Sequence, residues 1–157
     1  MATFYAMEHP EQVAGLLLVD PSHQDQVREM PQPPAWQRAL LTQLTRTAPI
    51  GLPRLVFGGS SDPVKTQTKH VRTFGAEIRG AMRSAERRAG TPVDLGDTPV
   101  YVLTRGDPTA GPMASEAANR ERWEIWRRLH AHLVEASTSA VRRHIVVEGA
   151  GHYIHYD

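Results

Sequence analysis

Three short apolar runs, far apart along the chain, constrain the fold more than any other feature. They are VAGLLLVD at Val13–Asp20, TPVYVLTRGD at Thr98–Asp107, and HIVVEGAGH within residues 143–152. Nearly continuous apolar runs of this length are typical of strands that are covered on both faces. Because helical segments separate the runs, the sequence predicts an α/β fold. Its sheet holds three parallel strands in the order 13–20, 98–107 and 143–148.

The segments between the runs show helical periodicity. Apolar side chains recur every three or four residues in 36–44, in 74–82 and in 115–135. In the last of these segments, Trp123 and Trp126 share one side with two leucines, which favours a packing role for both tryptophans. Helices are therefore expected to flank the strands.

The stretch from Pro21 to Gly96 is far longer than a simple crossover helix requires. It contains MPQPP and GLPRLVFGGSSDP, whose prolines and glycines indicate loops and breaks between helices. Such an insertion at the edge of a parallel sheet is expected to cover a binding crevice. The predicted organisation is a core of residues 1–24 and 97–157 with a helical cap of residues 25–96.

Composition excludes several classes of protein. The 157 residues carry a net charge of +1, which gives no basic field for nucleic acid or acidic lipid. The absence of cysteine excludes disulfides and thiol chemistry. No apolar stretch suits a membrane span, and no charged n-region precedes an apolar segment as in a signal peptide. We therefore expect a cytoplasmic protein that binds neither nucleic acid nor membrane.

Polar residues stand at the carboxyl ends of all three predicted strands: Asp20, Asp107 and His152. His152 follows Gly149-Ala150-Gly151, which allows a tight backbone turn that presents an imidazole ring. His152 and His155 lack a third ligand at a recognisable spacing, so neither a metal site nor a cofactor is expected. His130 and His132, two residues apart on a helix, are expected to point in different directions.

The order of these segments resembles the C-terminal half of an α/β-hydrolase. MATFYAMEHPEQVAGLLLVDPSH, at residues 1–23, is similar to the helix after the nucleophile elbow and the strand that follows it. PVYVLTRGD resembles the strand whose loop usually carries the acid of the catalytic triad. EGAGHYIHYD, at residues 148–157, resembles the loop that carries the triad histidine, and LPRLVFG is similar to cap segments. The resemblance implies a partial α/β-hydrolase fold with a helical cap insertion.

It also implies roles for three residues in the hydrolysis of an ester, amide or related acyl bond of a small molecule. His152 would be the general base of an esterase-like triad. Asp107 holds the usual position of the orienting acid, although an Asp-Pro pair is also a common turn. Asp20 is the alternative acid, since some members carry the acid at the end of that strand. The two aspartates remain alternatives at this point.

The chain departs from the family pattern because it contains no G-x-S-x-G motif. In the family this motif would lie directly before residue 1, and the earlier strands and the oxyanion-hole loop would precede it. The expectation is therefore a fragment that lacks the nucleophilic serine and is inactive alone. The alternative is a non-catalytic binding or interaction module that retains half of a hydrolase scaffold. In either case the exposed strand 13–20 is expected to favour self-association.

Overall fold

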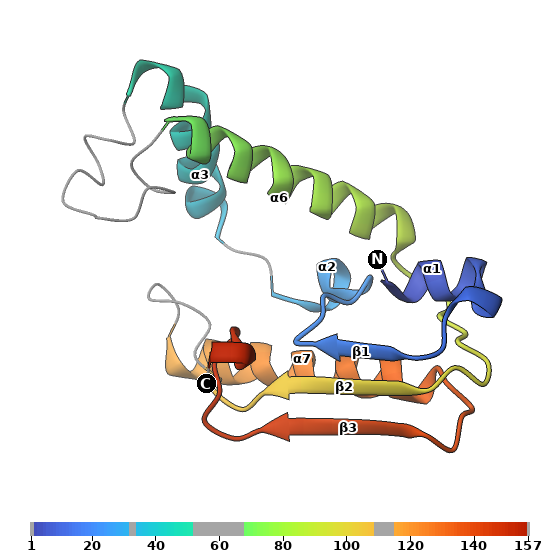
Figure 1. Cartoon of the computed structure of the whole chain (residues 1–157). Helices are drawn as coiled ribbons and strands as arrows, with labels where there is room; N and C mark the ends of the chain where they lie inside the picture. Colours follow the sequence, from blue (N-terminus) through green and yellow to red (C-terminus); the bar gives the residue numbers. More distant parts are fainter. Residues whose placement is uncertain (1, 32–33, 52–67, 109–114, 157) are drawn as a thin grey trace. The chain divides into compact units, whose positions relative to one another are not determined.

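The computed structural model describes residues 2–31, 34–51, 68–108 and 115–156 (Figure 1). The described chain forms two compact units, one of Met1–Met30 with Arg88–Asp157 and one of Pro31–Arg87. The division into domains remains a prediction, with a core of residues 1–24 and 97–157 and a cap of residues 25–96. The helices are α1 (Ala2–Glu8), α2 (Gln26–Glu29), α3 (Ala35–Thr47), α6 (Thr68–Arg88) and α7 (Glu116–Glu135), with short 3-10 turns at Pro10–Gln12, Ala48–Ile50 and Ile154–Tyr156.

The first unit contains a three-stranded parallel sheet in the order β1-β2-β3 (Figure 1). The strands are β1 (Leu16–Val19), β2 (Val100–Arg105) and β3 (Arg142–Val147). This confirms the α/β class and the predicted order of three parallel strands. Because the strands are parallel, their carboxyl ends meet at one edge of the sheet.

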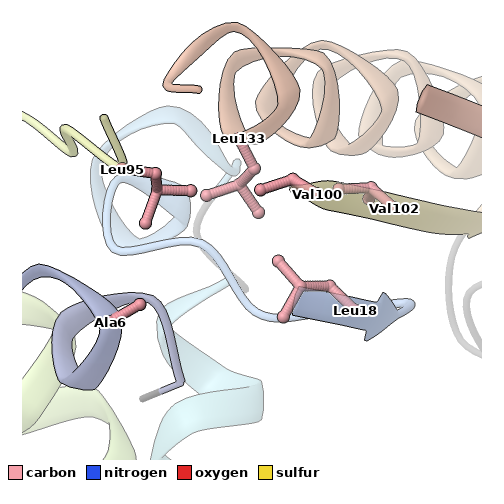
Figure 2. Packing of buried hydrophobic residues seen from close by; sticks show 6 residues of the cluster. All are labelled: Ala6, Leu18, Leu95, Val100, Val102 and Leu133. Carbon is pink, nitrogen blue, oxygen red and sulfur yellow. The ribbon is translucent and has the colours of Figure 1, made fainter. Parts of the chain in front are cut away.

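One face of the sheet is covered by α7, which packs on β2 and β3. This helix begins at Ser115, whose Oγ accepts a hydrogen bond from the backbone N–H of Ala118 at 3.2 Å. Side chains alternate along β2, so that Val100 and Val102 are completely buried on this face. Figure 2 shows Leu133 of α7 beside these two valines. The buried cluster comprises Ala6, Leu18, Leu95, Val100, Val102 and Leu133.

The opposite face of the sheet is more open, which corrects the prediction of strands covered on both faces. Val19 of β1 is paired in register with Leu103 of β2, which is paired with Ile145 of β3. Val19 is 42% exposed and Ile145 is 39% exposed, and Leu17 on the same face of β1 is 67% exposed. A continuous apolar run in the sequence thus does not distinguish a strand buried on both faces from one that exposes apolar side chains.

The second unit contains α3 and most of α6. The predicted apolar stripes of 36–44 and 74–82 fall within these helices, where Leu44 is buried but Trp36 is 60% exposed. On α6, Ile78 and Met82 are 44% and 43% exposed. The cap-like segment LPRLVFG lies outside the described residues.

The exposed edge of the sheet leads to a prediction of self-association. The N–H groups of Leu16 and Asp20 donate to Pro99 and Leu103 on the β2 side, so the alternate N–H groups of Leu17 and Val19 point away from β2. A flat, uncharged apolar edge can pair with an edge of another chain. We expect the isolated chain to form dimers or larger assemblies, measurable as mass by sedimentation at increasing concentration.

Leu17→Lys should weaken this association at least about tenfold, equivalent to about 1.4 kcal/mol, because pairing would place lysine ammonium groups at the new interface. Ile50→Lys is the matched control, since Ile50 is also apolar and 81% exposed but lies in the second unit. A wild-type chain that stays a monodisperse monomer with a cooperative melt would show that the edge is protected.

Candidate functional site

Asp20 directly follows β1 at the carboxyl edge of the sheet. Its backbone N–H donates to the carbonyl oxygen of Leu103 at 2.8 Å, which ties the end of β1 to β2. Its φ angle is +41°, in the left-handed region that aspartate tolerates better than most residues. The residue is 3% exposed. Such a backbone conformation at a buried carboxylate is a recognised feature of functional sites.

The buried carboxylate of Asp20 is surrounded by donors. The indole Nε1–H of Trp126 donates to Oδ1 at 2.7 Å, and the backbone N–H of Arg105 reaches the same oxygen at 3.4 Å. The guanidinium group of Arg105 lies 3.9 Å from Oδ2. These contacts offset the cost of taking a charged carboxylate out of water, and they also fix the direction in which Oδ2 points.

Oδ2 of Asp20 lies 2.5 Å from Nδ1 of His152, and the two residues are 132 positions apart in the chain. An ionised carboxylate only accepts hydrogen bonds, so the proton of this contact is on Nδ1. The side chain of His152 is 55% exposed, whereas that of Asp20 is completely buried. Nε2 of a neutral His152 is therefore the nitrogen available to accept a proton from a reacting group.

The loop that carries His152 is shaped by two glycines. Gly149 has a φ angle of +75°, which suits a residue without a side chain. At Gly106, after β2, an added Cβ would lie 2.5 Å from the carbonyl oxygen of Val147 and 2.7 Å from Cα of Glu148. The ends of β2 and β3 can therefore approach closely only with glycine at position 106.

The two candidate aspartates occupy different places around His152. Asp20 contacts the imidazole directly, as described above. Asp107 donates its backbone N–H to the carbonyl oxygen of Ala150 at 3.1 Å and so contacts the loop that carries the histidine. The structure thus brings the side chains of His152 and Asp20 together, and it brings the backbone of Asp107 to Ala150 in the histidine loop.

Both tryptophans of α7 contribute polar contacts in addition to packing. They are partly buried, and the Nε1–H of Trp123 donates to the carbonyl oxygen of Arg105 at 3.0 Å. Trp126 bonds Asp20, a role that the helical periodicity does not reveal. Side-chain chemistry could have predicted this contact, because a partly buried indole N–H usually finds an acceptor and an aspartate carboxylate has two acceptor oxygens.

The described residues 2–31, 34–51, 68–108 and 115–156 include no three histidine, aspartate or glutamate side chains arranged to hold a metal ion. In the same ranges, no helix combines the length and the apolar character that crossing a membrane requires. His130 is completely buried while His132 is exposed, so the two histidines do point in different directions.

Comparison with protein-family models, curated proteins and solved structures finds no significant match to this chain.

Proposed function

We propose that this chain supplies the acid and the base of a serine-type α/β-hydrolase triad, with Asp20 as the orienting acid and His152 as the general base. The observation that carries the proposal is the 2.5 Å contact between Oδ2 of a buried Asp20 and Nδ1 of a half-exposed His152. The nucleophilic serine would come from a segment outside the chain, because the sequence contains no G-x-S-x-G.

In this mechanism the serine hydroxyl attacks the carbonyl carbon of an ester or amide. Nε2 of His152 accepts the hydroxyl proton as the new C–O bond forms, and the resulting imidazolium is stabilised by the carboxylate of Asp20. His152 then returns the proton to the leaving group as the old bond breaks. Water repeats the same cycle on the acyl-enzyme, with His152 again taking and returning one proton.

The surroundings of Asp20 suit this role. Trp126 and Arg105 provide an indole N–H, a backbone N–H and a nearby guanidinium, which together stabilise the ionised carboxylate. An ionised acid in a fixed direction selects the His152 tautomer that has its proton on Nδ1 and a free lone pair on Nε2. The same geometry favours Asp20 over Asp107 as the triad acid.

The arrangement of strands also agrees with the proposal. Both groups lie at the carboxyl ends of parallel strands, β1 for Asp20 and β3 for His152, where open α/β sheets bind their ligands. The chain order of acid before histidine is that of the α/β-hydrolases. A non-catalytic module that keeps half of this scaffold would not require a carboxylate and an imidazole in hydrogen-bond contact.

Two measurements test the proposal. The genomic DNA directly upstream of the Met1 codon is expected to continue in frame into a strand that ends in G-x-S-x-G. The chain alone is expected to hydrolyse p-nitrophenyl acetate no faster than background, because both the nucleophile and the oxyanion-hole donors make large contributions to acyl transfer. A stop codon followed by a ribosome-binding site directly upstream would contradict the proposal and favour the interaction module.

Turnover of the ester by the isolated chain at an enzyme-like rate, with loss in His152→Ala, would contradict the claim that the nucleophile lies outside it. The matched control is His155→Ala, since His155 is an exposed histidine three residues away. A general loss of structure in the C-terminal turn would affect both variants, whereas catalysis by His152 would be lost in one only.

A further inference from the structure

A second set of hydrogen bonds reaches the Asp20 turn from inside the protein. His130 of α7 is completely buried, and its Nε2 lies 2.7 Å from the carbonyl oxygen of Pro21. Its Nδ1 lies 2.7 Å from Oγ1 of Thr104, a completely buried residue of β2. The same Oγ1 lies 2.7 Å from Nε2 of His144 on β3. The contacts form one chain from β3 through β2 and α7 to the residue after Asp20.

Hydrogen-bond chemistry gives this series of contacts a single direction when His130 is neutral. A carbonyl oxygen only accepts, so Nε2 of His130 donates to Pro21. Nδ1 of a neutral His130 then carries a lone pair and accepts from the hydroxyl of Thr104. The hydroxyl oxygen in turn accepts from Nε2–H of His144. A neutral His130 satisfies all these contacts only in the Nε2–H tautomer, whereas a protonated His130 would donate to Thr104 and reverse the two bonds of that hydroxyl.

Burial favours the same neutral state of His130. Desolvation lowers the pKa of this imidazole from 6.5 to about 4, even though the Pro21 carbonyl and Asp20 act in the opposite direction. His144 carries a lowered pKa as well, because of desolvation and the nearby Arg127. At neutral pH the three hydrogen bonds therefore run from His144 to Thr104, from Thr104 to His130, and from His130 to the carbonyl oxygen of Pro21.

Trp126 and His130 hold the Asp20 turn from two adjacent turns of α7. They are four residues apart on the helix, which places them on one side, and their ring centroids are 5.1 Å apart. Trp126 donates a hydrogen bond to the carboxylate of Asp20, while His130 donates one to the carbonyl oxygen of the next residue, Pro21. The backbone of Asp20 between these bonds has the φ angle of +41°. Two contacts from one helix thus fix a conformation that the backbone alone does not favour.

We infer that His130 is a positioning residue that holds the Asp20 turn through the Pro21 carbonyl and thereby aims Oδ2 at Nδ1 of His152. The catalytic significance of this inference rests on the proposed function. The positioning of Asp20 follows from the hydrogen bonds of His130 and does not depend on catalysis. Loss of the bond to Pro21 would allow the Asp20 turn to leave its left-handed conformation and move the carboxylate away from His152.

A matched pair of variants separates this bond from the rest of the side chain. In His130→Gln the amide nitrogen corresponds to Nε2 and can still donate to Pro21. In His130→Asn the shorter amide corresponds to Nδ1 and can reach only Thr104. Both variants are neutral amides at the same buried position, so desolvation and the loss of the ring affect them in similar ways.

The readout is the Nδ1–H proton of His152 in NMR spectra of full-length chain labelled with 15N-histidine. All spectra are taken in the Leu17→Lys background, so that edge pairing does not broaden them, and the signal is assigned by its loss in His152→Gln. We expect the wild type and His130→Gln to show this protected proton and His130→Asn to lose it. Retention of the signal at full intensity in His130→Asn would overturn the inference.

If His130→Asn does not fold, Thr104 provides the second pair. Thr104→Ser keeps the hydroxyl that donates to Nδ1 of His130, whereas Thr104→Val removes this donor, so that the imidazole is held less firmly against Pro21. The Nδ1–H signal of His152 should persist in the serine variant and decrease in the valine variant. Full intensity in both would overturn the inference. These readouts need no turnover, so they distinguish a failure of positioning from a failure of the proposed hydrolase activity.

Discussion

Asp20→Asn is expected to lower kcat about 10³- to 10⁴-fold in the proposed hydrolase, in which this chain is joined to a segment that carries the nucleophilic serine. The substitution is nearly isosteric, and asparagine tolerates the φ angle of +41° as well as aspartate does. Its amide can still accept from Trp126, but an amide N–H now faces Nδ1 of His152. The imidazole would then carry its proton on Nε2, the tautomer that cannot accept the serine proton.

The measurement is the rate of ester hydrolysis by the joined protein, with Asp107→Asn as the comparison. Asp107 also follows a strand, and the same neutral substitution keeps its backbone N–H to Ala150. We expect this variant to lose far less activity than Asp20→Asn. If Asp107→Asn causes the larger loss, the orienting role belongs to Asp107 and the assignment of Asp20 is wrong.

Lowering the pH from 7 to 4 is expected to reduce the free energy of unfolding by about 3 kcal/mol through His130 alone. The pKa of this histidine is about 4 in the folded protein and 6.5 when it is exposed by unfolding. As the pH falls through 6.5 the unfolded chain takes up a proton that the folded chain does not, so stability decreases between pH 6.5 and 4. Desolvation also lowers the pKa of His23 and of His144, which adds in the same direction.

Urea unfolding of the Leu17→Lys chain at several pH values between 7 and 4 measures this dependence. The carboxylates also respond to acid, so the informative quantity is the difference between each variant and its parent. His130→Gln should flatten the pH dependence, because the amide does not titrate. His155→Gln, which removes an exposed histidine, should leave it unchanged. An equal pH dependence in the parent and in His130→Gln would contradict a neutral, buried His130.

Local patterns were sufficient to predict the secondary structure that frames the site. Apolar runs predicted the three strands in the order that the sheet has, because strands of this length depend mainly on side chains close in sequence. The period of 115–135 predicted α7, and Ser115 caps that helix through Ala118. The glycines around Ala150 predicted a tight turn before His152, because such a turn depends mainly on local backbone freedom.

Pairing within the site was decided by the tertiary structure. Asp20 and Asp107 both follow strands whose ends meet at one edge, so their positions in the sequence left both as partners for His152. Asp20 contacts the imidazole because its left-handed turn is held by Trp126 and His130, which lie more than 100 residues later. The tertiary structure also determines which face of the sheet is covered, since Leu17 and Val19 are exposed although they belong to an apolar run. Hydrogen bonds and burial depend on which distant segments lie side by side in the folded protein. The residue pattern of one segment does not predict which distant segments it will contact.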